Sequence, residues 1–312
     1  MAMSIPGAAS KVGKRKPMSA LRRKEAMYGY IAILPWFIGF LIFTAGPMVF
    51  SAYLVFTEWE LLTPPVWVGL DNFRFLLEDQ MFRTTLWNTF LYTIVSVPLQ
   101  LLLALGVALL LNLNIRGTNL YRAIIFLPSQ TPVVASALLW FFIFSPTQGL
   151  ANAAIGLFGI PPQTWLWDID LVKPALIAVA VWAFGTAMII FLAGLQDIPQ
   201  SLYEAAELDG AGPISKLVNV TLPLLTPTIF FNLVIGLIGA FQVFTPVYLM
   251  TGGGPGNASM MMGLLIYREG FEEFNMGYAS LLAWVLFMII ITLTIIQFSV
   301  AKRWVYYEGD KA

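Results

Sequence analysis

The chain has 312 residues, of which 59% are hydrophobic, 14% aromatic and only 11% charged. Soluble globular domains carry about 25% charged residues, so this composition is typical of a polytopic membrane protein. Neither Cys nor His occurs in it, which excludes disulfides, Cys- or His-ligated metal sites and catalysis by Cys–His or Ser–His pairs. The formal net charge is zero, so no bulk basic field suggests nucleic acid as a partner.

The N-terminal residues 1–29 form a basic tail that is rich in Gly, Ser and Pro and is expected to be disordered. A cleavable signal peptide also begins with basic residues. However, the apolar run that follows, 30–56, is longer than the ~20 residues that span a bilayer, and no clear small-x-small cleavage site follows it. We therefore expect an uncleaved first transmembrane helix.

Five further apolar runs approach or exceed the length that crosses a bilayer: 86–111, 123–144, 174–195, 224–250 and 279–298. The predicted fold class is therefore an all-α membrane protein with six transmembrane helices over residues 30–298. A second tail, 299–312, ends the chain. Because the number of spans is even, both termini are expected on the same side of the membrane.

Basic residues indicate which side that is. The tails and the segments 112–123 and 196–223 hold 13 of the 17 Lys and Arg residues. The alternate segments 57–85, 145–173 and 251–278 hold the other four. Because Lys and Arg favour cytoplasmic loops, both termini and segment 196–223 are predicted to be cytoplasmic.

The predicted spans contain no Asp, Glu, Lys or Arg. Proton-driven transporters and intramembrane enzymes usually need ionisable groups at that depth. The sequence also has no GxxxxGK[ST] phosphate loop, so ATP hydrolysis, if it is involved, must belong to a partner.

A polar segment, 201–223, separates two of the apolar runs. Residues 204–208 are good helix formers with acids early in the segment, and Gly210 stands where a helix C-cap would turn through positive φ. Pro213 can then restart a short helix, and Pro223 opens the next apolar run. By spacing alone, this segment could equally be an interfacial helix-turn-helix that only joins two spans.

Its residues resemble a known motif. Glu204-Ala205-Ala206, Gly210 and Val220-Thr221-Leu222-Pro223 are similar to the EAA loop of permease subunits in binding-protein-dependent ABC importers, with Val220 in place of the usual Ile. Motifs similar to the sugar-type permeases follow in family order over about 30–306: Val68-Gly69-Leu70-Asp71-Asn72-Phe73, Asn88-Thr89, Phe126-Leu127-Pro128, Trp140, Gly149-Leu150-Ala151-Asn152, Trp182 and Leu249-Met250-Thr251-Gly252-Gly253-Gly254-Pro255.

This resemblance to the maltose/glycerol-phosphate-like branch implies a type I ABC importer permease fold in a prokaryotic plasma (inner) membrane. It implies a second permease subunit of different sequence, two cytoplasmic ATPases that bind ATP and Mg²⁺, and an extracytoplasmic solute-binding protein. It implies no cofactor in this chain. The implied solute is a sugar, most simply an oligosaccharide.

The resemblance also implies that helix 201–209 docks into a cleft on the ATPase, with the two alanines allowing close approach. The residues implied in this coupling are Glu204, Ala205, Ala206, Leu208, Asp209, Gly210 and Pro223.

Sugars are usually held by aromatic faces and neutral hydrogen-bonding side chains. The fourth and fifth spans offer both, and the candidate solute-pathway residues are Trp182, Thr186, Phe241, Gln242, Thr245 and Tyr248. Helix-to-helix packing is the alternative role for each of them. In the maltose-type arrangement, only one of the two permeases need touch the sugar.

Two alternatives stay open at this point. A glycerol phosphate or another polyol could be the solute, although a phosphate would favour a basic residue near the pathway and the spans offer none. An integral-membrane lipid-modifying enzyme would need clustered acids or bases. The one acid cluster, Glu204, Glu207 and Asp209, fits the EAA pattern better than a metal site.

Overall fold

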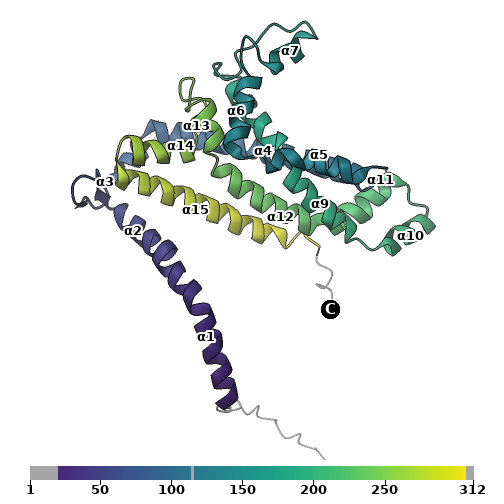
Figure 1. Cartoon of the computed structure of the whole chain (residues 1–312), viewed down its shortest axis with the longest axis horizontal. Helices are drawn as coiled ribbons and strands as arrows, with labels where there is room; N and C mark the ends of the chain where they lie inside the picture. The colour runs from purple at the N-terminus through teal and green to yellow at the C-terminus, as the bar shows by residue number, and fades with distance from the viewer. Residues whose placement is uncertain (1–19, 114–115, 307–312) are drawn as a thin grey trace, which may run out of the picture. The chain divides into compact units, whose positions relative to one another are not determined.

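The structure is a computed structural model that describes residues 20–113 and 116–306 (Figure 1). It consists of two compact units that part between Tyr53 and Leu54. The remaining parts of the two predicted tails, 1–19 and 307–312, lie outside the described residues.

The first unit is a helix that begins earlier than predicted. Helix α1 (Ala20–Phe40), the π-helical turn η1 (Leu41–Ala45) and α2 (Gly46–Leu54) follow one another without a break. The stretch Leu21–Leu54 is long and apolar enough to cross a membrane. Residues 20–27 are mostly Ala, Leu, Arg, Lys, Glu and Met, which are strong helix formers, so the helix extends ten residues into the predicted tail 1–29.

The second unit contains all the other elements. In chain order these are β1 (Thr57–Glu58), β2 (Val66–Trp67), α3 (Asp71–Glu78), α4 (Gln80–Leu111), α5 (Thr118–Gln130), α6 (Val133–Ile143), α7 (Leu150–Gly156), α8 (Val172–Trp182), α9 (Gly185–Gln196), α10 (Gln200–Leu208), α11 (Pro213–Lys216), η2 (Leu217–Thr221), α12 (Leu222–Phe241), α13 (Thr245–Met250), α14 (Met262–Tyr267), η3 (Arg268–Glu272) and α15 (Met276–Ala301). The strands pair antiparallel, with Thr57 opposite Trp67.

Helix α4 is the centre of the second unit, where it contacts α8, α9, α12 and α14. Its C-terminal half contains Ala104 and Ala108, which are both fully buried. Small residues let membrane helices approach closely, which suits a bundle that cannot use water exclusion between helices. Helix α12 also lies along α15, as Figure 1 shows.

Two predicted spans are bent helix pairs rather than straight helices. The predicted span 123–144 is α5 and α6, which meet at 94°, and the predicted span 174–195 is α8 and α9, which meet at 43°. Thr131 precedes Pro132 and is extended (φ −69°, ψ 131°), because the proline ring disfavours a helical residue before it. Counting each bent pair as one span, the described residues provide up to six.

The predicted span 224–250 is also interrupted. Helix α12 ends at Phe241, residues 242–244 form a link, and α13 begins at Thr245. Pro246 lacks the N–H that an uninterrupted helix would use to bond the Gln242 carbonyl, so the chain breaks there.

Candidate coupling elbow and solute pathway

The polar segment folds as two short helices, α10 and α11, joined by a tight turn; we call residues 200–221 the elbow. Gly210 has φ +79°, as the sequence predicted. Its N–H donates to the Glu207 carbonyl at 3.0 Å, and the Ala211 N–H donates to the Ala206 carbonyl at 2.9 Å. This pair of bonds caps the C-terminus of α10, and it requires a residue that accepts positive φ.

The second arm of the elbow is continuous with a membrane helix. Pro213 begins α11, as predicted, but no new helix starts at Pro223. Helix α11, the π-helical turn η2 and α12 form one unbroken stretch, Pro213–Phe241. Pro223 lies just after the π-helical turn η2, near the start of the apolar run that it was expected to open. Displacement of the elbow would act on this whole stretch.

Side chains also tie the two arms together. Lys216 Nζ lies 2.6 Å from Glu207 Oε1. The Tyr203 hydroxyl lies 3.0 Å from Thr221 Oγ1, which donates to the Lys216 carbonyl at 3.3 Å. These contacts were not predicted from the sequence. The opposite charges of Glu207 and Lys216 were the available signal, but nine residues separate them and only the turn brings them together.

One surface of the elbow is left exposed. Leu208 is 90% exposed and Ile214 78%, and Glu204, Ala205 and Asp209 are exposed as well. Ala206 is half-buried. Apolar side chains that project this far from a polar helix pair are suited to a protein partner.

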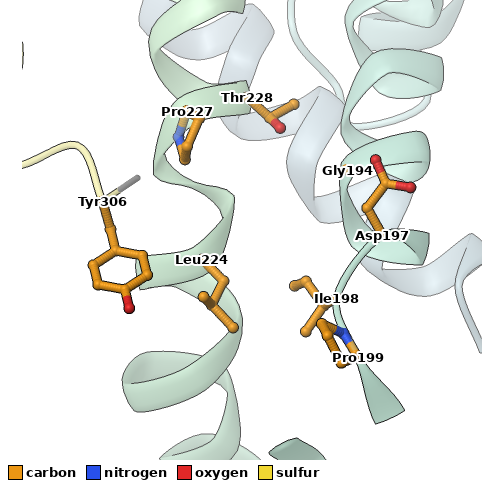
Figure 2. Close-up of a pocket in the computed structure, with 8 residues that line it drawn as sticks. All are labelled: Gly194, Asp197, Ile198, Pro199, Leu224, Pro227, Thr228 and Tyr306. Carbon is orange, nitrogen blue, oxygen red and sulfur yellow. The ribbon is translucent and has the colours of Figure 1, made fainter. Parts of the chain in front are cut away.

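A pocket of 220 Å³ lies at the root of the elbow (Figure 2). Its lining comes from α9, the link to α10, α12 and the C-terminal segment: Gly194, Asp197, Ile198, Pro199, Leu224, Pro227, Thr228 and Tyr306. In Figure 2 the Asp197 and Thr228 side chains lie on opposite walls. The Tyr306 N–H donates to Thr226 Oγ1 at 2.9 Å. The pocket therefore lies between the ends of α9 and α12 next to the elbow, and the two helices touch at its wall, where a Cβ at Gly194 would lie 2.5 Å from Thr228 Oγ1.

The predicted pathway residues Trp182 and Thr186 flank the break between α8 and α9. Ser129 Oγ of α5 donates to the Ala183 carbonyl and accepts from the Thr186 N–H, both at 3.2 Å. Gln100 Nε2 of α4 also donates to the Ala183 carbonyl at 3.2 Å. These side chains satisfy backbone groups that the break frees within the apolar bundle.

Close approach at this break requires a glycine. A Cβ at Gly185 would lie 2.6 Å from Ser129 Oγ and 2.9 Å from the Ile125 carbonyl. Trp182 packs edge-on against Trp140, with ring centroids 5.6 Å apart, and Thr186 is exposed. Ser129 and Gln100 were not predicted as site residues, because their role depends on where the chain bends.

The remaining predicted pathway residues lie around the link 242–244. Gln242 is exposed at the end of α12, Thr245 opens α13 and Tyr248 is 41% exposed. Phe241 is only 2% exposed and packs in the core with residues of α15, so this structure does not offer it to a solute. Among the described residues, no hydrogen bond or ring contact joins this group to Trp182 or Thr186.

Acidic residues also gather around β1 and η3, so Glu204, Glu207 and Asp209 are not the one acid cluster that was expected. Glu58, Glu60, Glu269, Glu273 and Asn275 line a pocket of 360 Å³. Burial, with Asp79 and Glu273 nearby, raises the pKa of Glu269 above its ordinary value. Within residues 20–113 and 116–306, no group of three or more acids has the geometry to hold a metal ion.

Long apolar helices, bent helix pairs and an exposed polar elbow are typical of a multi-pass membrane protein. The chain belongs to the family of binding-protein-dependent transport system inner membrane components, whose family model matches residues 100–305. Its relatives are named as transport permeases rather than enzymes.

Three relatives illustrate the range. The chain is 42% identical to the "Probable ABC transporter permease protein YesP" of Bacillus subtilis, covering 93% of this chain and 95% of that protein. It is 32% identical to the trehalose/maltose transport system permease protein MalF of Thermococcus litoralis (91% and 97% covered). It is 34% identical to the sn-glycerol-3-phosphate transport system permease protein UgpA of Yersinia pestis (77% and 82% covered).

A solved structure has the same fold. A chain of a bacterial alginate ABC transporter, crystallised with its alginate pentasaccharide-bound periplasmic protein, superposes with a TM-score of 0.78 at 24% identity. The match covers 91% of this chain and 96% of that one. The type I importer permease fold predicted from the motifs is therefore confirmed.

Proposed function

We propose that this chain is one of two permease subunits of an ABC importer and that it passes a neutral sugar, an oligosaccharide in the simplest case, across the membrane. The observation that supports this most directly is the elbow: an exposed, capped helix pair that is continuous with a membrane helix over Pro213–Phe241. The partners of this assembly are a second permease of different sequence, two cytoplasmic ATPases and an extracytoplasmic binding protein.

Coupling runs through the elbow. Helix α10 docks on the ATPase with Glu204, Ala205 and Leu208 at the contact, and Gly210 holds the helix at the required angle. When the ATPases bind ATP and Mg²⁺ and close, they displace α10. The Glu207–Lys216 and Tyr203–Thr221 contacts then transmit that displacement into α12. In this orientation both termini and the elbow face the cytoplasm.

The solute is neutral. The predicted spans contain no Arg or Lys to pair with a phosphate or carboxylate. The exposed polar groups near the breaks, Gln242 and Thr186, are neutral hydrogen-bonding side chains, and Trp182 and Tyr248 supply aromatic surface. Named relatives handle trehalose and maltose in one case and sn-glycerol 3-phosphate in another, so glycerol phosphate is the competing solute.

The test is ATPase stimulation in proteoliposomes that contain the complete complex. Its binding protein is loaded in turn with maltose, trehalose, a longer maltooligosaccharide or glycerol 3-phosphate. We expect stimulation and uptake with a neutral sugar and none with glycerol 3-phosphate. Stimulation by glycerol 3-phosphate alone would overturn the proposed solute, and uptake without any ATPase would overturn the proposed mechanism.

A further inference from the structure

Four aromatic side chains from two separate segments form one cluster beside the candidate solute pathway. Phe244 and Tyr248 lie at the end of the fifth span, whereas Tyr267 and Phe271 lie on α14 and η3. The Tyr267 ring centroid is 5.2 Å from that of Phe244, 5.3 Å from that of Tyr248 and 5.5 Å from that of Phe271. Tyr267 therefore joins the two segments. We call these four residues the aromatic cluster.

The segment that bears Tyr267 and Phe271 is held in place by backbone contacts. Thr89 Oγ1 of α4 accepts from the Met262 N–H at 2.9 Å in the buried interior. At Gly263, α14 passes so close to the end of the fifth span that a Cβ would lie 2.8 Å from the Val243 carbonyl. These contacts hold α14 in place against α4 and the fifth span. The aromatic side chains on it therefore lose less conformational entropy when a ligand binds.

The aromatic cluster is open at both ends. Phe271 is 62% exposed and Tyr248 41%, in contrast to Phe241, which is 2% exposed in the neighbouring core. The Tyr248 and Tyr267 rings meet edge to face with their centroids 5.3 Å apart, so each of them adds a hydroxyl to the aromatic cluster. Exposed rings next to neutral hydroxyls match the apolar faces and hydroxyl rims of a sugar ring.

Negatively charged side chains near the aromatic cluster disfavour anionic ligands. Glu269 and Glu272 lie on the same turn as Phe271, and Glu273 follows directly. Arg268 donates to the Gly252 carbonyl at 3.0 Å and lies 3.6 Å from Glu272, whose charge it offsets. Among the described residues, Glu269 and Glu273 have no such ion pair. A phosphate or uronate beside Phe271 would stand within about a Debye length, ~8–10 Å, of these carboxylates and be repelled.

We propose that Phe271 and Tyr267, together with Tyr248, form a stacking surface for a neutral sugar ring on the outer part of the solute pathway, extending it beyond the residues identified from the sequence. This inference rests on the proposed function and deepens it, since it assigns a contact for the solute and a basis for rejecting anionic ones.

The first test measures uptake kinetics in the reconstituted complex with maltose and with trehalose. Phe271→Ala is expected to raise KM about fivefold, equivalent to roughly 1 kcal/mol, with the maximal rate little changed. Phe271→Tyr keeps the ring and should restore the KM. The matched control is Phe142→Ala, because Phe142 is 70% exposed on α6 and outside the aromatic cluster.

The second test uses the absence of cysteine from the chain. Phe271→Cys is introduced alone and treated with a membrane-impermeant methanethiosulfonate reagent in the assembled complex. We expect reaction from the outer side, and slower reaction once the maltose- or trehalose-loaded binding protein is present. Phe142→Cys, treated in the same way, should show no such protection.

The outcomes separate this inference from the proposed function. If the wild-type complex takes up maltose or trehalose but Phe271→Ala leaves the KM unchanged, the inference alone is overturned. If Phe271→Cys reacts in the isolated chain and not in the complex, the second permease covers the aromatic cluster, which again overturns the inference alone. If the wild type takes up glycerol 3-phosphate and neither sugar, both fail.

Discussion

At the scale of single residues, Gly210 and Glu269 show how backbone conformation and electrostatics constrain this protein. A Cβ added at Gly210 would meet no other atom within 4 Å, yet the φ of +79° at this residue disfavours any L side chain. At Glu269, by contrast, the side chain fits but its negative charge is disfavoured by burial and by nearby carboxylates. A different prediction follows for each residue.

Replacing Gly210 by Val should uncouple ATP hydrolysis from uptake while leaving membrane insertion intact. A β-branched residue at positive φ costs about 1–3 kcal/mol, which is enough to disrupt the turn between α10 and α11. Uptake and ATPase activity of the reconstituted complex are measured together. Gly212→Ala is the control, since Gly212 has φ −72° and open space around it. Normal coupling in Gly210→Val would contradict the elbow's role.

Replacing Glu269 by Gln should stabilise the protein at neutral pH. The raised pKa means that the folded state holds this proton more tightly than the unfolded state, whose ordinary pKa is 4.5. Stability is therefore lost as pH rises through 4.5 towards the raised value, and it stays reduced above that value.

The measurement is thermal unfolding in detergent. Glu269→Gln should raise Tm at pH 7 and lose most of that gain below pH 4.5. Glu78→Gln, at an exposed position on α3, is the control and should leave Tm nearly unchanged. An unaltered Tm for Glu269→Gln at pH 7 would show that the surrounding carboxylates do not destabilise the folded state.

At the scale of elements, breaks in helices matter as much as the helices themselves. Proline, together with the side chains of Ser129 and Gln100, produces or supports bends where the sequence suggested straight spans. In the elbow and fifth span, by contrast, α11, η2 and α12 follow one another without a break over Pro213–Phe241. The elbow and α12 should therefore move as one lever.

Reversing the charge of the Glu207–Lys216 pair tests that lever. Lys216→Glu should lower uptake per ATP hydrolysed, because it replaces the attraction between Lys216 and Glu207 with repulsion between two carboxylates. The double variant Glu207→Lys/Lys216→Glu should recover coupling. The pair is partly exposed, so its effect on stability is expected to be only about 0.2–1 kcal/mol. Full coupling in the single variant would mean that the arms move together without this contact.

At the scale of the whole molecule, the distribution of basic residues predicts that the elbow is cytoplasmic. Single cysteines introduced into the naturally cysteine-free chain can test this orientation in intact cells. A membrane-impermeant thiol reagent should label Gln148→Cys, in the segment predicted to be outside, and should not label Ser201→Cys until the cells are opened. Both positions are exposed, so burial cannot explain a difference. Labelling of Ser201→Cys in intact cells would show that the elbow faces the outside, which would overturn the proposed function.

The sequence by itself determined the class of protein, the existence of the spans and the place of the elbow. These depend on local properties: the length of uncharged runs, the helix-forming residues at 204–208 and the need for glycine at residue 210. Each can be recognised without knowing what lies across the fold.

Only the tertiary structure decided where the spans bend, how the elbow's arms are joined and which pathway candidates are accessible. Phe241 and Tyr248 are both aromatic and seven residues apart, yet one is buried against α15 and the other is exposed beside Tyr267. The reason is physical. In an apolar bundle almost every side chain is compatible with burial, so hydrophobicity along the chain cannot distinguish core from pathway, and only the packing of distant segments does so.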